Sequence, residues 1–407
     1  MHTRSPVLPP WMIALACGSL VMTIAIGARQ VCGLFLRPVT SDLGFSREMF
    51  GLAIGLQNLV WGLTQPFAGL LADRIGARPI VVVTGCCYAL GLAMAAMASD
   101  SIVFTLGLGV LVGLGQSGTT YAVILALIGR LVPDAQRSRY LGLASAAGSV
   151  GMFVMVPATS VLLDLVEWRT TLLLLAAVAA TIPLLAVWLA EKRTSAAMGA
   201  AAVPASSAFA SAVADRDYWL LNLGFASCGF QLAFIGTYLP TILTEGALSM
   251  AIAAAVLACI GAFNIPGTYL CGLAGGRQPK ARVLAAVYLA RGVVILGFLA
   301  LPLSATSAII FAALIGLLWL GVVPLTSGLV ADLWGRRELG FLFGIVFVGH
   351  QVGAFVGAWA GGFVFDRTGN YTLVWLVVVG LSVSAAAFHL MVREQPRACA
   401  LQAAGDD

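Results

Sequence analysis

Long hydrophobic runs follow one another along the chain from Trp11 to Val392, separated by short polar segments. Most of these runs hold about twenty residues or more, and a helix of that length crosses the roughly 30 Å of hydrocarbon in a bilayer. The strands of a membrane barrel would instead alternate apolar and polar residues with a period of two. The pattern therefore predicts an all-α membrane protein.

Twelve runs are long enough to be transmembrane helices. A segment rich in Ala and Ser, residues 191–217, separates the sixth run from the seventh and is expected to be a flexible cytoplasmic linker. We therefore expect an N-terminal six-helix bundle over residues 1–190 and a C-terminal six-helix bundle over residues 218–407, which ends in a short cytoplasmic tail. The predicted spans are 11–36, 48–72, 79–98, 102–129, 140–163, 169–190, 218–241, 248–272, 283–302, 305–329, 340–365 and 371–392.

Composition supports the same class, since 60% of the 407 residues are hydrophobic and only 10% are charged. The eight cysteines are scattered or adjacent, without the spacing of a metal or redox site, so we expect no metal and no cofactor. Within the spans we find no nucleophile arrangement and no carboxylate pair, which argues against an enzyme. The net charge of +5 calls for no nucleic acid partner.

The distribution of Lys and Arg predicts the orientation in the membrane. Of the 22 basic residues, sixteen fall in the termini and loops on the side of the N-terminus, and four fall on the other side. The remaining two, Arg29 and Arg291, lie inside spans. Both termini are therefore expected to be cytoplasmic, in a plasma membrane or in the inner membrane of a bacterium. The four basic residues of the outer loops are Arg37, Arg47, Arg169 and Arg367.

A charged motif, GLLADRIGAR, lies between the second and third spans. A weaker copy, GLAGGRQPKAR from Gly272, lies at the corresponding place in the second half, which indicates duplication of one bundle. With the twelve spans and the central linker, the motif makes the chain resemble the major facilitator superfamily over its whole length. The motif positions are Gly69, Asp73, Arg74, Gly76 and Arg78.

This resemblance implies a secondary transporter that alternates between inward-open and outward-open states. It also implies that Asp73 helps to close the inner gate by pairing with Arg130 and with the N-terminus of the eleventh helix. The alternative is that these charges only fix the topology. Because Gly276 replaces the aspartate in the second copy, we expect only the first half to make such a pair.

Two stretches, GARQVCGLFLRPVTSDLGFSR and GFLFGIVFVGHQVGAFVGAWAGGFVFDRTGNY, resemble a narrower branch. This branch comprises bacterial carriers related to monocarboxylate transporters and oxalate–formate antiporters. The aspartate and arginine that monocarboxylate transporters use in their eighth helix do not occur here. The matching stretch, GAFNIPGTYLCG, offers Asn264 and Thr268 instead.

Arg29 and Arg291 carry the strongest chemical signal, because an arginine near the membrane centre costs roughly 2.5–3.5 kcal/mol to insert. Arg29 presents a planar fork that matches a carboxylate, so we interpret it as an anion clamp on the cavity-lining first helix. The alternative is a structural bond to carbonyl groups of the fifth or eleventh helix. For Arg291, on a helix that is peripheral in the family, a structural contact is favoured and substrate binding is the second choice.

His350, with Gln351 beside it, is the only imidazole that we place deep in a span. Since all 17 acidic residues fall in loops or at helix ends, His350 is the candidate for proton coupling if protons are moved. The alternative is a hydrogen bond across a helix interface, because glycines recur every four residues along this span.

The sequence thus predicts a monomeric secondary transporter for a small organic anion, a mono- or dicarboxylate, with the lipid bilayer around it and protons as a candidate coupling ion. An exporter of amphipathic drugs or metabolites is the alternative, and a non-transporting membrane sensor is a weaker one. Polar residues expected to line the cavity with the two arginines and His350 are Gln30, Gln57, Asn58, Gln116, Gln231, Tyr238, Asn264 and Gln351.

Overall fold

The computed structural model describes residues 9–133, 136–189, 212–335 and 339–394, and this part of the chain is helical, with no strand. Eleven of its helical segments are long and apolar enough to cross a membrane. The second predicted span lies in α3 (Arg47–Ile75), which is not among the eleven. This 29-residue helix carries Gln57, Asn58 and Gln65 in its middle, and these polar side chains lower its hydropathy.

The first half of the chain forms the helices α1 to α10. In addition to α3 they are α1 (Pro10–Gln30), the 3₁₀ turn η1 (Val31–Phe35), α2 (Leu36–Leu43), α4 (Ala77–Ala96), α5 (Ser101–Phe104), the π-helical segment η2 (Thr105–Leu111), α6 (Val112–Thr119), α7 (Tyr121–Leu131), α8 (Arg137–Leu165), α9 (Trp168–Ala179) and α10 (Thr181–Ala186).

The second half forms the helices α12 to α18. They are α12 (Arg216–Glu245), α13 (Met250–Arg277), α14 (Lys280–Ala300), α15 (Ala305–Leu317), α16 (Val322–Trp334), α17 (Leu339–Thr368) and α18 (Thr372–Met391). Most of the predicted linker lies outside the described residues, and α12 begins at Arg216, two residues before the predicted bundle.

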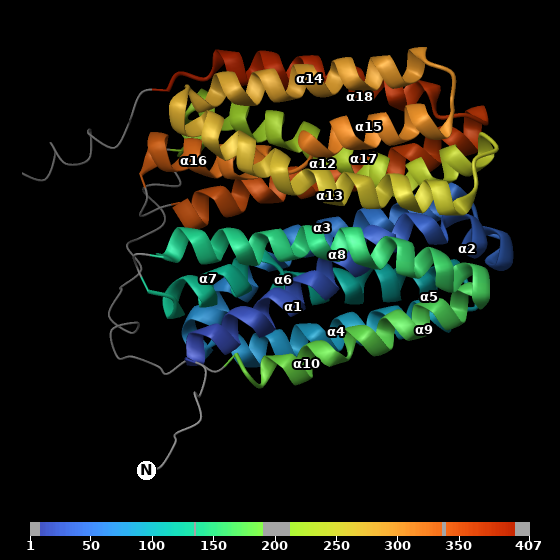
Figure 1. Cartoon of the computed structure of the whole chain (residues 1–407), viewed down its shortest axis with the longest axis horizontal. Coiled ribbons are helices and arrows are strands. Elements are labelled where there is room, and N and C mark those ends of the chain that lie inside the picture. The colour runs from blue at the N-terminus through green and yellow to red at the C-terminus, as the bar shows by residue number, and fades with distance from the viewer. Residues whose placement is uncertain (1–8, 134–135, 190–211, 336–338, 395–407) are drawn as a thin grey trace, which may run out of the picture.

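The helices lie side by side along one direction, with α1 to α10 below and α12 to α18 above in the view of Figure 1. Helix α1 begins and α18 ends on the same side of the molecule, at the left of the figure. We call this side the terminal end and the opposite side the far end. The helix pairs α3 with α17 and α8 with α13 pack the two halves against each other.

Three predicted spans are interrupted rather than continuous. The sixth breaks at Ala180 and the tenth between Leu318 and Gly321, and in each case a proline follows as the third residue of the new segment, Pro183 or Pro324. Proline has no N–H to donate, so it is tolerated in a first helical turn but not in a helix interior. The fourth span breaks at Thr120, whose backbone is extended.

The first helical stretch is also longer than predicted. It was expected to end at residue 36, but the helical backbone passes through η1 into α2 and continues to Leu43. Arg29 lies at the end of α1, where the backbone tightens to a 3₁₀ turn. It is therefore farther from the end of the helical stretch than the predicted boundary would place it.

Candidate binding site

A small cavity lies beside Arg29 where the two halves meet. It is about 20 Å³ in volume, which is room for about one water molecule. Segments α1 and η1, with α3, form the wall of the first half, and α12 forms the wall of the second. The lining residues are Arg29, Gln30, Cys32, Gly33, Ile54, Gln57, Asn58, Leu232, Ala233, Gly236 and Thr237.

The Arg29 guanidinium is only partly satisfied by the protein. Its Nη2 donates a hydrogen bond of 2.7 Å to Oδ1 of Asn58, and its carbon lies 5.4 Å from the centre of the Trp61 ring. Its buried Nε has no hydrogen-bond partner among the described residues. A buried donor without a partner is costly, so this group is available to a polar or anionic ligand.

Two glutamine amides add further polar groups to this cavity. Gln57 is fully buried, and within the described part of the chain neither its amide nitrogen nor its oxygen has a hydrogen-bond partner. The amide nitrogen of Gln30 is likewise buried and unpaired there. Arg29, Gln30, Gln57 and Asn58 are therefore the predicted site residues that the structure brings together.

Trp61 was not predicted as part of the site. It lies three residues after Asn58 on α3, so the two share one helix face, and that spacing could have identified it. Its Nε1 donates to the hydroxyl of Thr120 at 3.1 Å, at the break between α6 and α7. The ring therefore connects Arg29 to the interrupted fourth span.

Gln231 and Tyr238, which were expected to line the cavity, are not among its lining residues. The Gln231 amide donates to the hydroxyl of Ser382 at 2.9 Å, and the Tyr238 hydroxyl donates to the Ala358 carbonyl at 2.5 Å. Both contacts lie inside the second half. The cavity wall of α12 is instead the neighbouring face that carries Gly236 and Thr237.

Arg291 is only 1% exposed, and protein groups occupy its guanidinium. Its Nε donates to the Leu318 carbonyl at 2.8 Å and its Nη2 to the Trp319 carbonyl at 2.5 Å. Its Nη1 donates to the Gln231 side chain at 3.2 Å. These carbonyls lie in the break directly after α15, so Arg291 satisfies acceptors that the break leaves open and lies at the negative end of the helix dipole.

Asn264 supports the same break from another helix. Its Oδ1 accepts the Leu320 backbone N–H at 2.9 Å, and its Nδ2 donates to the hydroxyl of Ser149 at 2.8 Å. Since Ser149 belongs to α8, this side chain also joins the two halves. The Gln116 side chain, by contrast, is fully buried on α6, and neither its amide nitrogen nor its amide oxygen has a hydrogen-bond partner among the described residues.

His350 lies on α17 between two aromatic rings. Its ring stacks on Phe347 at 5.9 Å and lies 4.6 Å from the Phe225 ring, while its Nδ1 is 3.0 Å from Oε1 of Gln351. Its Nε2 is buried, with no partner in the described segments. His350 is the imidazole that was placed deep in a span, but it is not the only buried one.

The second buried imidazole is His389 near the end of α18, which is fully buried. It stacks on Tyr288 at 5.1 Å, and its Nδ1 lies 2.6 Å from the Ala385 carbonyl. Gly224 gives it room, because a Cβ at that position would lie 2.2 Å from the imidazole. A residue so close to the end of a predicted span is buried by packing that the sequence alone does not show.

Charged pairs lie at the terminal end of each half. Asp73 and Arg130 are 2.9 Å apart in the first half, and both side chains are partly exposed. The second half has Gly276 in place of the motif aspartate but forms a different pair, because Lys280 and Asp332 are 2.6 Å apart there. The signs are exchanged: the base follows α13, and the acid lies near the end of α16. The other motif residues, Gly69, Arg74, Gly76 and Arg78, surround the turn from α3 to α4.

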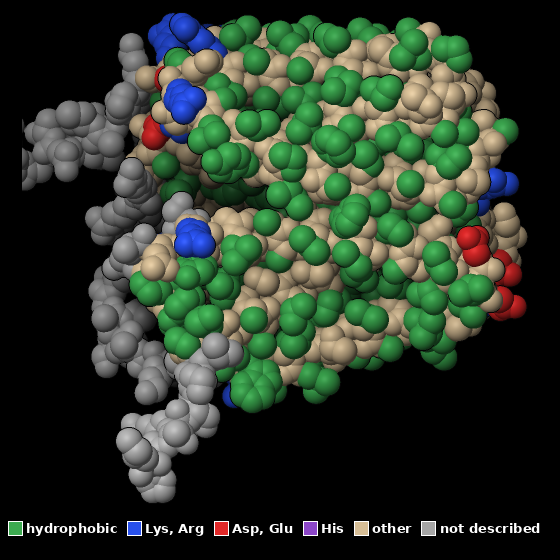
Figure 2. Space-filling model, viewed as in Figure 1, with side chains coloured by type: hydrophobic (Ala, Val, Ile, Leu, Met, Phe, Trp, Pro, Cys, Tyr) green, Lys and Arg blue, Asp and Glu red, His purple; other side chains and the backbone are tan. Residues whose placement is uncertain are grey.

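The two halves are in close contact beside Arg29. A Cβ on Gly33 of η1 would lie 2.3 Å from the Gly236 carbonyl oxygen of α12, so only glycine permits this approach. Towards the terminal end, Figure 2 shows the surface hollowed between the upper and lower halves. The molecule is therefore closed beside Arg29 at the far end and more open between its halves at the terminal end.

Comparison with known proteins shows the family of this chain. Residues 15–326 match the family model described as Major Facilitator Superfamily. An uncharacterized MFS-type transporter, YcxA, of Bacillus subtilis (strain 168) is 26% identical over 91% of this chain and 93% of its own length. Monocarboxylate transporter 11 of Homo sapiens is 27% identical over 95% of this chain and 85% of its own.

A relative named for a different role is similar to the same degree. Multidrug resistance protein MdtH of Klebsiella pneumoniae (strain 342) is 28% identical over 88% of each chain. Among solved structures, a bacterial homolog of the human lysosomal transporter Spinster, in an inward-facing and occupied conformation, shares the fold. Its TM-score is 0.73 at 16% identity, over 93% of this chain and 96% of that one. The chain therefore belongs to the Major Facilitator Superfamily and is a multi-pass membrane transporter rather than an enzyme.

Proposed function

We propose that this transporter carries a small organic anion, a mono- or dicarboxylate, and that Arg29 binds the carboxylate. The single observation that carries the proposal is the half-buried Arg29 guanidinium, whose buried Nε no described residue satisfies. The unpaired amides of Gln30 and Gln57 add donors beside it. A carboxylate would satisfy these donors and neutralise the one cation of the site.

Binding would act on the conformational equilibrium of the transporter. The cavity of about 20 Å³ is too small for an organic acid, so the halves must separate before a substrate enters. A bound anion shifts the equilibrium only by the difference between its affinities for the two states. In this mechanism, the carboxylate replaces water as the partner of Arg29 once the halves have separated and the substrate has entered.

The proposal also covers how the chain crosses the membrane. We take α3 as a twelfth membrane crossing, because its 29 residues exceed the length that a bilayer requires and it packs along α17. The chain then forms two six-helix bundles joined by the linker of residues 191–217. The terminal end faces the cytoplasm of a plasma membrane or a bacterial inner membrane, as the bias of Lys and Arg favours, and the protein works as a monomer.

Protons are the coupling ion that we propose for transport. His350 is the candidate, because its Nε2 is buried without a partner in the described segments and its Nδ1 is next to Gln351. His350→Gln should then abolish any response of uptake to an imposed pH gradient. Uptake driven by the anion gradient alone should persist in this variant.

Export of amphipathic compounds is the second candidate, and one observation favours it. An apolar groove of about 510 Å³ lies along α1 and α8. It contains the Trp11 and Tyr140 rings, whose centres are 4.9 Å apart. An exporter of this kind would depend on the groove and much less on Arg29.

Uptake into proteoliposomes tests the first proposal. A panel of radiolabelled mono- and dicarboxylates is offered to the wild type, to Arg29→Ala and to Arg29→Lys, with and without a pH gradient. We expect saturable uptake by the wild type and a loss of at least about a hundredfold in Arg29→Ala, since a charge-assisted pair in a desolvated site is worth roughly 3 kcal/mol. Arg29→Lys should recover part of the uptake, because it restores the charge but not the fork.

The matched control is Arg37→Ala, which removes an exposed arginine of α2. This variant should transport like the wild type. Carboxylate uptake that is indifferent to Arg29, or absent from the wild type, would overturn the proposal. Efflux of amphipathic dyes that is lost in Trp11→Ala and kept in Arg29→Ala would then favour the exporter.

A further inference from the structure

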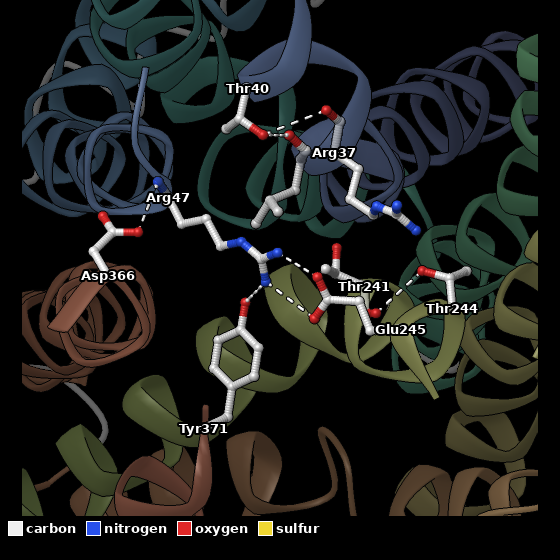
Figure 3. Close-up of polar contacts among 9 residues, drawn as sticks. Arg37, Thr40, Arg47, Thr241, Thr244, Glu245, Asp366 and Tyr371 are labelled. Carbon is white, nitrogen blue, oxygen red and sulfur yellow. Dashed lines mark hydrogen bonds and ion pairs between the residues drawn. The ribbon is translucent and has the colours of Figure 1, made fainter. Parts of the chain in front are cut away.

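The far end carries a cluster of charged and aromatic side chains that joins the two halves. We call it the Arg47 cluster. Figure 3 shows Arg47 extended between Glu245 and Tyr371, with Asp366 at its backbone. Its members come from the start of α3 in the first half and from α12, α17 and the start of α18 in the second. They are Arg47, Glu48, Glu245, Trp359, Asp366, Arg367 and Tyr371.

The first link is made by the Arg47 side chain. Its guanidinium forms a bidentate ion pair with the Glu245 carboxylate and donates a hydrogen bond of 2.8 Å to the Tyr371 hydroxyl. The guanidinium carbon also lies 3.6 Å from the centre of the Phe365 ring. Only 17% of the Arg47 side chain is exposed, so water screens this pair less than an ordinary surface pair.

The second link is a helix cap supplied by the opposite half. The Asp366 carboxylate of α17 accepts the backbone N–H groups of Arg47 at 3.3 Å and Glu48 at 2.8 Å. These are the first two residues of α3, whose N–H groups have no partner within their own helix. The negative charge also lies at the positive end of the α3 dipole. Separation of the halves would leave both N–H groups without this partner.

In the third link the acid belongs to the first half and its partners belong to the second. The Glu48 carboxylate of the first half accepts from Arg367 at 2.8 Å and from the Trp359 indole at 3.1 Å. Each half therefore contributes both an acid and a base to the contact. The two ion pairs described at the terminal end, Asp73 with Arg130 and Lys280 with Asp332, each lie within one half instead.

We propose that the Arg47 cluster is a latch that holds the far end closed, and that its rupture opens the Arg29 site to that side. The proposal rests on the proposed function, because it assigns the cluster to the access route of that site. The latch is specific to the closed arrangement, since every one of its links crosses between the halves. Weakening it shifts the population towards the state that is open at the far end.

Alkylation of Cys32 tests the latch without any substrate. Cys32 lines the Arg29 cavity next to Gly33 and is buried beneath the far-end contact. A membrane-impermeant maleimide is added to sealed vesicles whose outer surface is the far end, and mass spectrometry follows the modification of Cys32 in time. We expect slow modification in the wild type and a rate about tenfold higher in Arg47→Gln and in Asp366→Asn, the effect of losing one charge-assisted hydrogen bond.

Asp42→Asn is the matched control, because Asp42 pairs with Arg169 at 3.0 Å at the same end but within the first half. Its rate should equal that of the wild type. Glu48→Arg and Arg367→Glu should each raise the rate as single variants, and the double variant should restore slow modification. These charge reversals also test the latch if a variant that neutralises one charge fails to fold.

Equal rates in the wild type and in all cluster variants would overturn the latch, and so would an equal rise in Asp42→Asn. Because the readout needs no transported anion, a failed latch leaves the Arg29 uptake experiment standing. Conversely, if the uptake experiment rejects a carboxylate as the substrate, the result of the Cys32 labelling is unchanged.

Discussion

At the scale of single residues, Arg29 and Arg291 show how one side chain type serves two purposes inside a membrane protein. Arg291 donates to two carbonyl groups in the break after α15, so the protein satisfies its donors. Arg29 meets one amide oxygen and one ring face, and its Nε remains without a described partner. The number of satisfied donors, not depth along the helix, separates the structural arginine from the candidate binding residue.

This difference predicts opposite behaviour on substitution. Arg291→Lys should destabilise the protein by about 1–3 kcal/mol, because one ammonium group cannot satisfy both carbonyls and a buried acceptor loses its partner. Thermal unfolding in detergent, followed by the loss of the monodisperse peak, measures the effect. Arg282→Lys, an exposed position on the same helix, should unfold like the wild type. A wild-type unfolding temperature for Arg291→Lys would contradict the structural role.

At the scale of helices, the contact between the halves depends on glycines that allow the backbones to touch. Gly362 of α17 faces the carbonyl group of Arg47, and a Cβ there would lie 2.2 Å from the carbonyl oxygen. Backbone atoms of another helix cannot yield as the end of a flexible side chain can. The close contact is therefore possible only while this residue remains glycine.

Gly362→Ala should consequently hold the far end open. We expect carboxylate uptake to fall by about tenfold or more, since closing costs at least the strain of one overpacked contact, roughly 1–3 kcal/mol. The Cys32 modification rate should rise at the same time. Gly344→Ala on the same helix is the control, because the nearest atom to its Cβ would be 3.9 Å away. Normal uptake by Gly362→Ala would contradict a role for this close contact in transport.

The interrupted helices belong to this scale as well. The break in the tenth span exposes backbone groups that Arg291 and Asn264 satisfy from neighbouring helices. A break at membrane depth is tolerated only where protein surrounds it in this way. The prolines mark two of the breaks in the sequence, whereas the polar partners that support the tenth span come from residues far away along the chain.

At the scale of the whole molecule, the two ends are built differently. The described ion pairs of the Arg47 cluster join the halves, and those at the terminal end stay within one half. Separation at the terminal end therefore breaks none of these four pairs, whereas separation at the far end breaks two. This asymmetry matches the surface hollow between the halves in Figure 2.

The proposed two-bundle organisation predicts that the halves assemble without a covalent connection. Residues 1–201 and 202–407, expressed as separate chains in one cell, should restore saturable uptake to a substantial fraction of the wild type. The reason is that the contacts of α3 with α17 and of α8 with α13 do not involve the linker. Each half expressed alone should be inactive. Co-purified halves without any uptake would argue against autonomous bundles.

The sequence by itself determined the class, the helix content and the family resemblance. These follow from run length, composition and a local motif, which act over short stretches of chain. It also made Arg29 a candidate binding residue, because a charge within an apolar span is costly wherever the helix packs. Its neighbours Gln30, Gln57 and Asn58 could be named for the same reason, as polar residues within apolar spans.

Only the tertiary structure decided what these polar residues contact. It paired Gln231 and Tyr238 with other groups of the second half. It also gave the second half an ion pair of Lys280 with the signs exchanged, and assembled the Arg47 cluster from four separate segments. A side chain's partner depends on helix rotation and on which helices are neighbours. Long-range packing fixes both, so no local pattern in the sequence specifies them.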